Sequence, residues 1–156
     1  QHYGVRPDGL SMAKALGGGF PIGAAAVTPE LSNVFQPGNH ASTFGGTPLA
    51  SAAALAVLDT IEKEGLLDNA AKMGALFMEG LRDLARKHPC IQTVRGLGLM
   101  IGVVLSVPAK PVEARLRENG LLCIATGDHV LRFVPPLVVT PGHIRQALDI
   151  LDRSLD

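Results

Sequence analysis

Residues 7–24, which read PDGLSMAKALGGGFPIGA, decide the fold of the N-terminal part of this chain. One lysine, Lys14, stands in a run of apolar and small residues, and the three consecutive glycines Gly17–Gly19 follow it closely. Glycine loses much backbone entropy in a helix or a strand, so these three predict a loop that comes close to another group. Residues 24–27 then predict a short buried strand, and residues 28–30 predict the start of a one-turn helix.

Two long helices are predicted in the middle of the chain. Residues 36–48 are polar, rich in glycine and without periodicity, which is typical of a loop. An Ala- and Leu-rich helix is predicted from Pro48 to Glu64, with Gly65 in the position that commonly ends a helix. Residues 67–87 carry apolar side chains at helical spacing and predict a second helix.

The last third of the chain predicts a small α+β unit. From residue 90 on, the predicted order is β-α-β-β-α. Its predicted elements are a strand run over 94–107, a helix over 111–119, strands over 121–125 and 128–133, and a helix that begins at Thr140 and Pro141. We therefore expect a domain boundary near Gly65, with residues 1–65 in one domain and 66–156 in the next.

The composition excludes several classes of protein. Of 156 residues, 47% are hydrophobic and 18% are charged, which is typical of a folded globular chain. Lys and Arg number 14, as do Asp and Glu, so no broad positive field exists to bind nucleic acid or an acidic membrane. No apolar run reaches the roughly 18 residues of a membrane span. The two cysteines, Cys90 and Cys123, are interpreted as reduced, buried thiols of a cytoplasmic protein. Because the chain begins with Gln1 rather than Met, we expect that part of the protein precedes it.

Lys14 is the first candidate for chemistry. A lysine among apolar and small residues is expected to be desolvated, which favours the neutral amine, and a neutral amine is a nucleophile that can form a Schiff base. A surface lysine at the edge of a loop is an equally good interpretation of the residues alone.

Two further segments carry candidate binding residues. In the loop Asn39–Gly46, the hydroxyls of Ser42 and Thr43 and the backbone N–H groups could form an anion-binding nest, although a solvated turn is the more common outcome. Arg132 alternates with Leu131 and Phe133 on a predicted strand and could bind a carboxylate through two hydrogen bonds. A structural ion pair, for example with Asp128 or Glu113, is the alternative for Arg132.

Other motifs are absent or weak. No phosphate-binding GxxxxGK[ST] loop, no HExxH zinc motif and no complete GxGxxG sequence occur. His40 and His129 lack metal-ligand spacing to another His, Cys or acidic residue, so no metal site is predicted. Arg95, which precedes Gly96-Leu97-Gly98, is interpreted as structural.

Taken together, four segments resemble the class-III aminotransferases that depend on pyridoxal 5'-phosphate. Residues 7–24 resemble the lysine segment of that family, and 40–50 (HASTFGGTPLA) resemble its second signature. Residues 95–99 (RGLGL) and 131–137 (LRFVPPL) resemble the third and fourth, in the family's order. Two differences are mild, Ala41 where glycine is usual and Thr47 where asparagine is usual.

The resemblance implies a role for each candidate residue. Lys14 would carry pyridoxal phosphate covalently and move a proton during the reaction. Thr43, contributed by the neighbouring subunit of a homodimer, would bind the cofactor phosphate, and Ser42 would lie near the substrate. Arg132 would bind the substrate α-carboxylate.

The resemblance also implies a fold and a reaction. The fold would be an α/β fold of the aspartate-aminotransferase type, fold type I: residues 1–65 are the tail of its large cofactor-binding domain and 66–156 its α+β small domain. The segments are most similar to the acetylornithine branch of the family, which implies amino transfer from N2-acetyl-L-ornithine to 2-oxoglutarate in arginine biosynthesis. The ornithine or another ω-amino-acid branch is a close alternative.

Two other hypotheses stay open at this point. An aminomutase of the glutamate-semialdehyde type shares the fold and the lysine, but Arg132 argues against it. The chain could also be a non-catalytic fragment. The carboxylate, aromatic ring and phosphate loop that the family's active site needs lie upstream of the lysine segment, so we expect the chain to be inactive without the N-terminal part of the enzyme.

Overall fold

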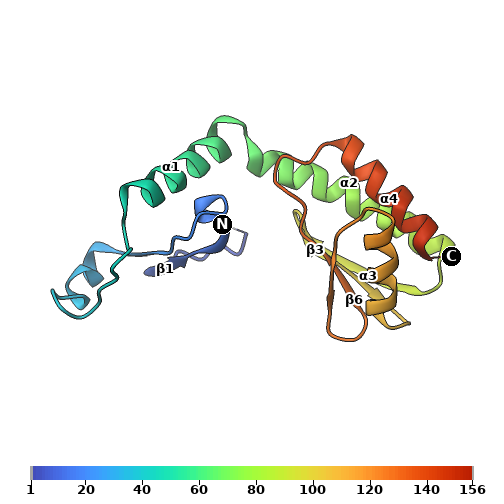
Figure 1. Ribbon diagram of the computed structural model, residues 1–156, viewed down its shortest axis with the longest axis horizontal. Coiled ribbons are helices and arrows are strands. Elements are labelled where there is room, and N and C mark those ends of the chain that lie inside the picture. The colour runs from blue at the N-terminus through green and yellow to red at the C-terminus, as the bar shows by residue number, and fades with distance from the viewer. Residues whose placement is uncertain (1, 156) are drawn as a thin grey trace. The chain divides into compact units, whose positions relative to one another are not determined.

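The computed structural model describes residues 2–155 of the chain and divides it into two compact units, residues 1–64 and 65–156. Each unit is described by itself below (Figure 1). Among the described residues, no helix is long and apolar enough to cross a membrane.

The N-terminal unit combines a hairpin with short 3-10 helices and one long helix. Strand β1 (Gly9–Met12) pairs antiparallel with β2 (Ala24–Val27), and the 3-10 helix η1 (Lys14–Gly17) lies in the connection between them. A second 3-10 helix, η2 (Pro29–Val34), and a loop lead to α1 (Pro48–Lys63). Strand β1 and helix η1 were not predicted, and η2 is longer than the single turn that Thr28 and Pro29 predicted.

This unit has almost no core of its own. Its buried residues are Gly17, Ala50 and Ala54, all small. Many large apolar side chains are exposed, including Phe44 at 83% and Leu49 at 66%. Strand β2, which was predicted to be buried, is exposed along its whole length. Exposed apolar surface of this extent is typical of sites that contact protein, membrane or ligand.

The C-terminal unit is a four-stranded antiparallel sheet with three helices on one face. Its elements are α2 (Leu66–Lys87), β3 (Ile91–Leu97), β4 (Met100–Leu105), α3 (Ala109–Glu118), β5 (Ile124–Thr126), β6 (Val130–Phe133) and α4 (Pro141–Leu155). The strand order is β3-β4-β6-β5. Figure 1 shows α2, α3 and α4 together on one side of these strands.

The order of elements differs from the prediction at one point. The run predicted over 94–107 is not one strand but the hairpin β3–β4, because the chain reverses at Gly98, whose φ is +54°. The last two predicted strands are shorter than expected, and α3 begins two residues earlier. The two long helices lie within a residue or two of their predicted bounds.

The core of this unit lies between the sheet and its helices. Alternate strand residues point into it, and Leu81, Ile101, Val103, Leu116, Leu131 and Leu151 are completely buried. Phe77 on α2 and Phe133 on β6 stack edge to face with ring centroids 5.4 Å apart. No helix of residues 65–155 covers the opposite face of the sheet, which we call the open face, and its outward-pointing residues are exposed within this unit.

The end of α2 is tied to α4 through one carboxylate. Asp152 accepts a hydrogen bond of 2.6 Å from Lys87 Nζ, and its other oxygen lies 2.6 Å from His88 Nε2. The hydrogen bonds from Lys87 and then His88 hold the pKa of Asp152 below its usual value. These interactions of Asp152 stabilise the folded state at neutral pH. A carboxyl whose pKa is lowered on folding loses its contribution to stability only as the pH falls through that lowered pKa.

Two glycines on α2 give a matched test of the packing. A Cβ at Gly74 would collide with the backbone carbonyl of Gly98 in the β3–β4 turn, whereas a Cβ at Gly80 would meet the flexible end of Leu148. Both alanines gain helix propensity, by about 1 kcal/mol. We expect Gly74→Ala to destabilise the protein by about 1–3 kcal/mol, because backbone cannot move aside as a side chain can.

Urea unfolding of the two variants measures this difference. Gly80→Ala should lower the free energy of unfolding clearly less than Gly74→Ala does. Equal stability of the two variants would mean that α2 and the β3–β4 turn do not pack as described.

Candidate functional site

Lys14 begins the 3-10 helix η1 in an uncommon backbone conformation. Its φ is +57°, and it is the one residue other than glycine with positive φ in the described part of the chain. The left-handed conformation costs an L-residue about 1–2 kcal/mol. Such strain is retained where the surrounding structure enforces it, and it is concentrated at functional sites.

The glycines after Lys14 enforce this turn. Gly17 is buried, and a Cβ there would lie 2.8 Å from Ile22 Cγ2. Gly18 has φ +60°, donates its N–H to Ala15 at 3.0 Å, and would place a Cβ 3.0 Å from Val57 on α1. Residues larger than glycine would therefore displace the turn that sets the direction of Lys14.

The side chain of Lys14 is exposed, so the expectation that it is desolvated is wrong for this chain. The unit around it buries only small residues, and none of them covers the lysine. Lys14 forms no side-chain hydrogen bond or ion pair with the described residues. Its amine is therefore available to a ligand.

Ser42 and Thr43 lie in an exposed turn of the loop before α1. The N–H of Gly45 donates to the carbonyl of Ser42 at 3.2 Å, which closes the turn. Within the described residues, neither hydroxyl has a hydrogen-bond partner. No hydrogen bond between described residues joins this loop to Lys14. The structure thus shows a solvated turn with two available hydroxyls, and does not bring Ser42 or Thr43 to the lysine.

Arg132 lies on β6 in the C-terminal unit, with its side chain on the open face of the sheet. Leu131 and Phe133 on either side are buried, so the predicted alternation is confirmed. Arg132 forms no ion pair within the described residues, and Glu113, one of its predicted alternatives, pairs with Arg117 at 3.2 Å. The structure therefore does not support the alternative of a structural ion pair.

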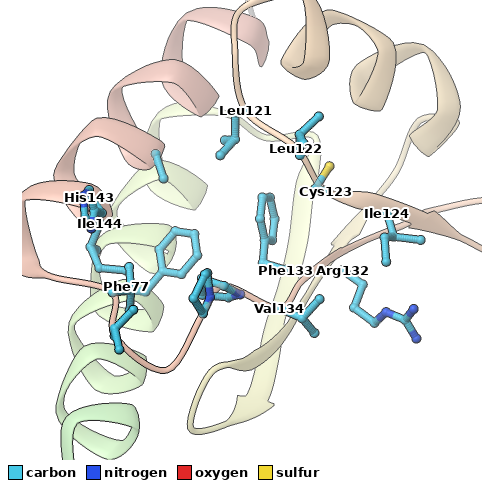
Figure 2. A pocket seen from close by; sticks show the side chains of 15 residues that line it. Phe77, Leu121, Leu122, Cys123, Ile124, Arg132, Phe133, Val134, His143 and Ile144 are labelled. Carbon is cyan, nitrogen blue, oxygen red and sulfur yellow. The ribbon is translucent and has the colours of Figure 1, made fainter. Parts of the chain in front are cut away.

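A cavity of about 560 Å³ lies beside Arg132. It is lined mainly by apolar side chains of α2, α4 and the segments around β5 and β6, including Phe77, Leu121, Phe133 and Ile144. Figure 2 shows Phe133 projecting into its middle, while the guanidinium of Arg132 is directed outward at the rim. The lining residues with polar or ionisable side chains are Cys123, Arg132 and His143.

Arg95 on β3 was interpreted as structural, but it shares the open face with Arg132. It pairs in register with Gly102, and Gly102 pairs with Arg132. Only the hairpin reversal at Gly98 shows this relation, and the sequence predicted no reversal there. The glycines at 96 and 98 are the signal that could have indicated it.

Metal ligands do not gather anywhere in the described part of the chain: no three side chains of His, Cys, Asp or Glu lie close enough to hold an ion. The donors at the candidate residues are instead an amine, two hydroxyls and guanidinium groups. These bind aldehydes, phosphates and carboxylates, which fits the chemistry of pyridoxal phosphate and of amino-acid substrates.

Solved structures match this architecture over nearly the whole chain. An acetylornithine aminotransferase from Elizabethkingia anophelis superimposes with a TM-score of 0.93 at 36% identity, covering 99% of this chain and 42% of that one. An ornithine aminotransferase from Toxoplasma gondii, described with partial occupancy of PLP, gives 0.92 at 38% identity, covering 99% and 38%. The fold is thus the mixed α/β fold of the PLP aminotransferases, in its C-terminal part.

Sequence relatives identify the family. The chain is 50% identical to the acetylornithine aminotransferase of Caldanaerobacter subterraneus subsp. tengcongensis, covering 99% of this chain and 39% of that protein. It is 45% identical to the ornithine aminotransferase of Brevibacillus brevis, covering 97% and 38%. The model of the class-III aminotransferases matches residues 1–155, and the chain belongs to that family. It spans about two fifths of the length of these relatives.

Cys123, beside the cavity, provides a test of this part of the structure. Burial, and secondarily the charge of Glu113, raises the pKa of its thiol to about 11. A shift of about two units lowers the thiolate fraction near pH 8 about a hundredfold, while the more basic thiolate regains roughly tenfold in nucleophilicity. We expect its alkylation by iodoacetamide to be about tenfold slower than that of free cysteine.

Peptide mapping by mass spectrometry, in a Cys90→Ser background, follows Cys123 separately. Its alkylation rate should keep rising about tenfold per pH unit up to pH 10. Both cysteines are half-buried and not fully buried as predicted. A rate that levels off near pH 9 would contradict the half-buried placement of the Cys123 thiol.

Proposed function

We propose that this chain is the C-terminal part of a pyridoxal-phosphate-dependent aminotransferase that transfers the amino group of N2-acetyl-L-ornithine to 2-oxoglutarate in arginine biosynthesis. The observation that carries the proposal is Lys14: it lies in the family's lysine segment, adopts a strained backbone conformation and has a free amine. The similarity to acetylornithine aminotransferases, at 50% identity in one case, supports this choice of amino donor.

Lys14 would hold the cofactor and transfer the proton of the substrate Cα. Pyridoxal phosphate supplies an aldehyde that condenses with an amine and a ring that accepts electrons from the substrate Cα. Lys14 would hold the cofactor through its Nζ and would carry a proton to or from the substrate Cα. The left-handed turn fixes the backbone of Lys14 at the start of η1.

The remaining residues would bind and orient. Arg132 binds the α-carboxylate of the substrate, with its planar guanidinium making two parallel hydrogen bonds. Thr43 binds the cofactor phosphate in the active site of the neighbouring subunit of a homodimer, and Ser42 lies close to the substrate. Both hydroxyls are exposed and have no partner among residues 2–155, which supports roles that involve other molecules.

A chain of this length would need the rest of the enzyme. The carboxylate that keeps the cofactor ring protonated is expected in the part of the relatives that this chain does not span. The exposed apolar surface of residues 2–64 supports an extensive contact with that part of the enzyme and with a second subunit. We propose that residues 1–65 belong to the large domain and 66–156 to the small domain, that the enzyme is a cytoplasmic homodimer, and that the chain alone is inactive.

Ornithine is the second candidate for the amino donor. Ornithine aminotransferases also match the chain, at 45% identity for the Brevibacillus brevis protein. Initial rates of the full-length enzyme with the two donors, each with 2-oxoglutarate, would separate these candidates.

Replacing Lys14 tests the proposal. In the full-length enzyme, Lys14→Ala should abolish the visible absorbance of the cofactor–lysine linkage and reduce turnover to background. Lys14→Arg should do the same, because arginine stays protonated. Lys63→Ala, which removes an exposed lysine of α1 paired with Asp59, is the matched control and should retain both.

Absorbance spectra and turnover with acetylornithine and 2-oxoglutarate measure the effect. Near-normal turnover by Lys14→Ala would show that another residue carries the cofactor.

A further inference from the structure

The turn that carries Lys14 lies beyond the end of the β1–β2 ladder, whose last residue on β1 is Met12. Within the turn, the N–H groups of Leu16, Gly18 and Phe20 each donate to the carbonyl three residues earlier, at 3.2, 3.0 and 3.0 Å. Hydrogen bonds of this 3-10 type have poorer geometry than those of an α-helix. These local bonds alone do not explain why Lys14 keeps a left-handed backbone, with φ +57°.

Helix α1 closes one side of this turn. It packs against η1, and its inward face carries the buried residues Ala50 and Ala54. Val57 is half-buried and lies three residues beyond Ala54, on the same face of the helix. Its Cγ2 lies 3.0 Å from the position that a Cβ would take at Gly18. Outside the turn itself, no other heavy atom of the described residues comes within 4 Å of that position.

The contact with Val57 meets the turn at the end opposite to Lys14. Lys14 begins η1 and Gly18 is its C-cap, with φ +60°. The hydrogen bond from Gly18 to Ala15 links the two ends of this short helix, so a contact that fixes Gly18 also restricts the backbone of Lys14. A left-handed L-residue persists where the surrounding structure enforces that conformation. Val57 supplies such enforcement from outside the turn.

We propose that Val57 is a positioning residue for Lys14: it closes the space beside Gly18 and thereby holds the backbone of Lys14 in the left-handed conformation. The inference rests on the proposed function, in which Lys14 holds the cofactor. It adds to that function a residue of α1 that acts through the glycine turn.

The preference of an L-residue for right-handed backbone sets the size of the expected effect. A lysine released from the turn would occupy the left-handed region roughly 5- to 30-fold less often. A reaction that requires the left-handed conformation slows by the same factor. Because Val57→Ala releases the turn partly or fully, it should lower the rate constant for linkage of Lys14 to pyridoxal phosphate about 3- to 30-fold.

Rapid mixing of the cofactor-stripped full-length enzyme with pyridoxal phosphate, followed by visible absorbance, measures this rate constant without turnover. The matched control is Ile61→Ala, which removes more apolar volume from the same face of α1, one helical turn further on. Its rate constant should stay within about twofold of the wild type. The thermal midpoint of each variant reports stability separately.

Hydrogen exchange of the cofactor-stripped enzyme gives a second readout. Mass spectrometry of the peptide that contains Leu16, Gly18 and Phe20 follows the N–H groups that close the turn. Their exchange should be faster in Val57→Ala and unchanged in Ile61→Ala, because exchange reports local opening.

A double variant tests the contact itself. Gly18→Ala places a Cβ against Val57 and should also slow linkage formation, because neither group has room for the other. In Gly18→Ala/Val57→Ala the space is free again, so the double variant should form the linkage faster than Gly18→Ala alone. Additive losses would mean that the two positions do not act through one contact.

The outcomes separate this inference from the proposed function. A wild-type rate constant in Val57→Ala would overturn the inference and leave the proposed function intact. Equal losses in Val57→Ala and Ile61→Ala would make Val57 a part of the general packing of α1 and would also overturn it. If the wild-type enzyme forms no linkage with pyridoxal phosphate, the proposed function fails and the inference fails with it.

Discussion

The pairing of β4 with both β3 and β6 is the constraint on which the C-terminal unit depends. It places Ile101 and Val103 in the core under α2 and α4, and it puts Gly102 between two arginines on the other face. A shift of one residue in either pairing would exchange the two faces and bury arginine in the core. The cost of burying an unpaired charge fixes the register as firmly as the apolar packing does.

The difference between the two faces of the sheet also explains why Arg132 is exposed although its strand is firmly packed. Leu131 and Phe133 are buried on either side of it, and Phe133 stacks against Phe77. The inward residues therefore hold the strand in place, and the side chain of Arg132 stays exposed on the other face. Sites built on rigid strands position their groups more accurately than sites on loops.

The N-terminal unit shows the opposite arrangement. Its elements form locally, through the β1–β2 hairpin and the glycine turn at Gly17 and Gly18, but it buries few side chains. The backbone of Lys14 is held in a left-handed conformation, and no surrounding core covers its side chain. Within the described residues its amine is exposed, although the sequence around it is apolar.

Much of this could be predicted from the sequence, and the failures have physical causes. The helices α1, α2 and α4 were found because apolar spacing, Pro48 and Thr140 mark them clearly. The residues Lys14, Ser42, Thr43 and Arg132 were singled out by their chemistry and by motif resemblance. The hairpin reversal at Gly98 was missed because one glycine among three gave no unique turn signal.

Burial was also mispredicted, because it depends on which surfaces meet and not on local composition. The exposure of Lys14 and of strand β2 shows this most clearly. Arg95 was passed over for a related reason: its relation to Arg132 exists only through strand register.

Chemical mapping of the attachment site tests the central claim most directly. The full-length enzyme, loaded with pyridoxal phosphate and reduced with borohydride, would carry the cofactor through a stable secondary amine that survives proteolysis. Our account predicts that mass spectrometry finds the pyridoxyl group on the peptide that contains Lys14. Recovery of the group on another lysine, or a non-covalently held cofactor that reduction leaves unattached, would contradict it.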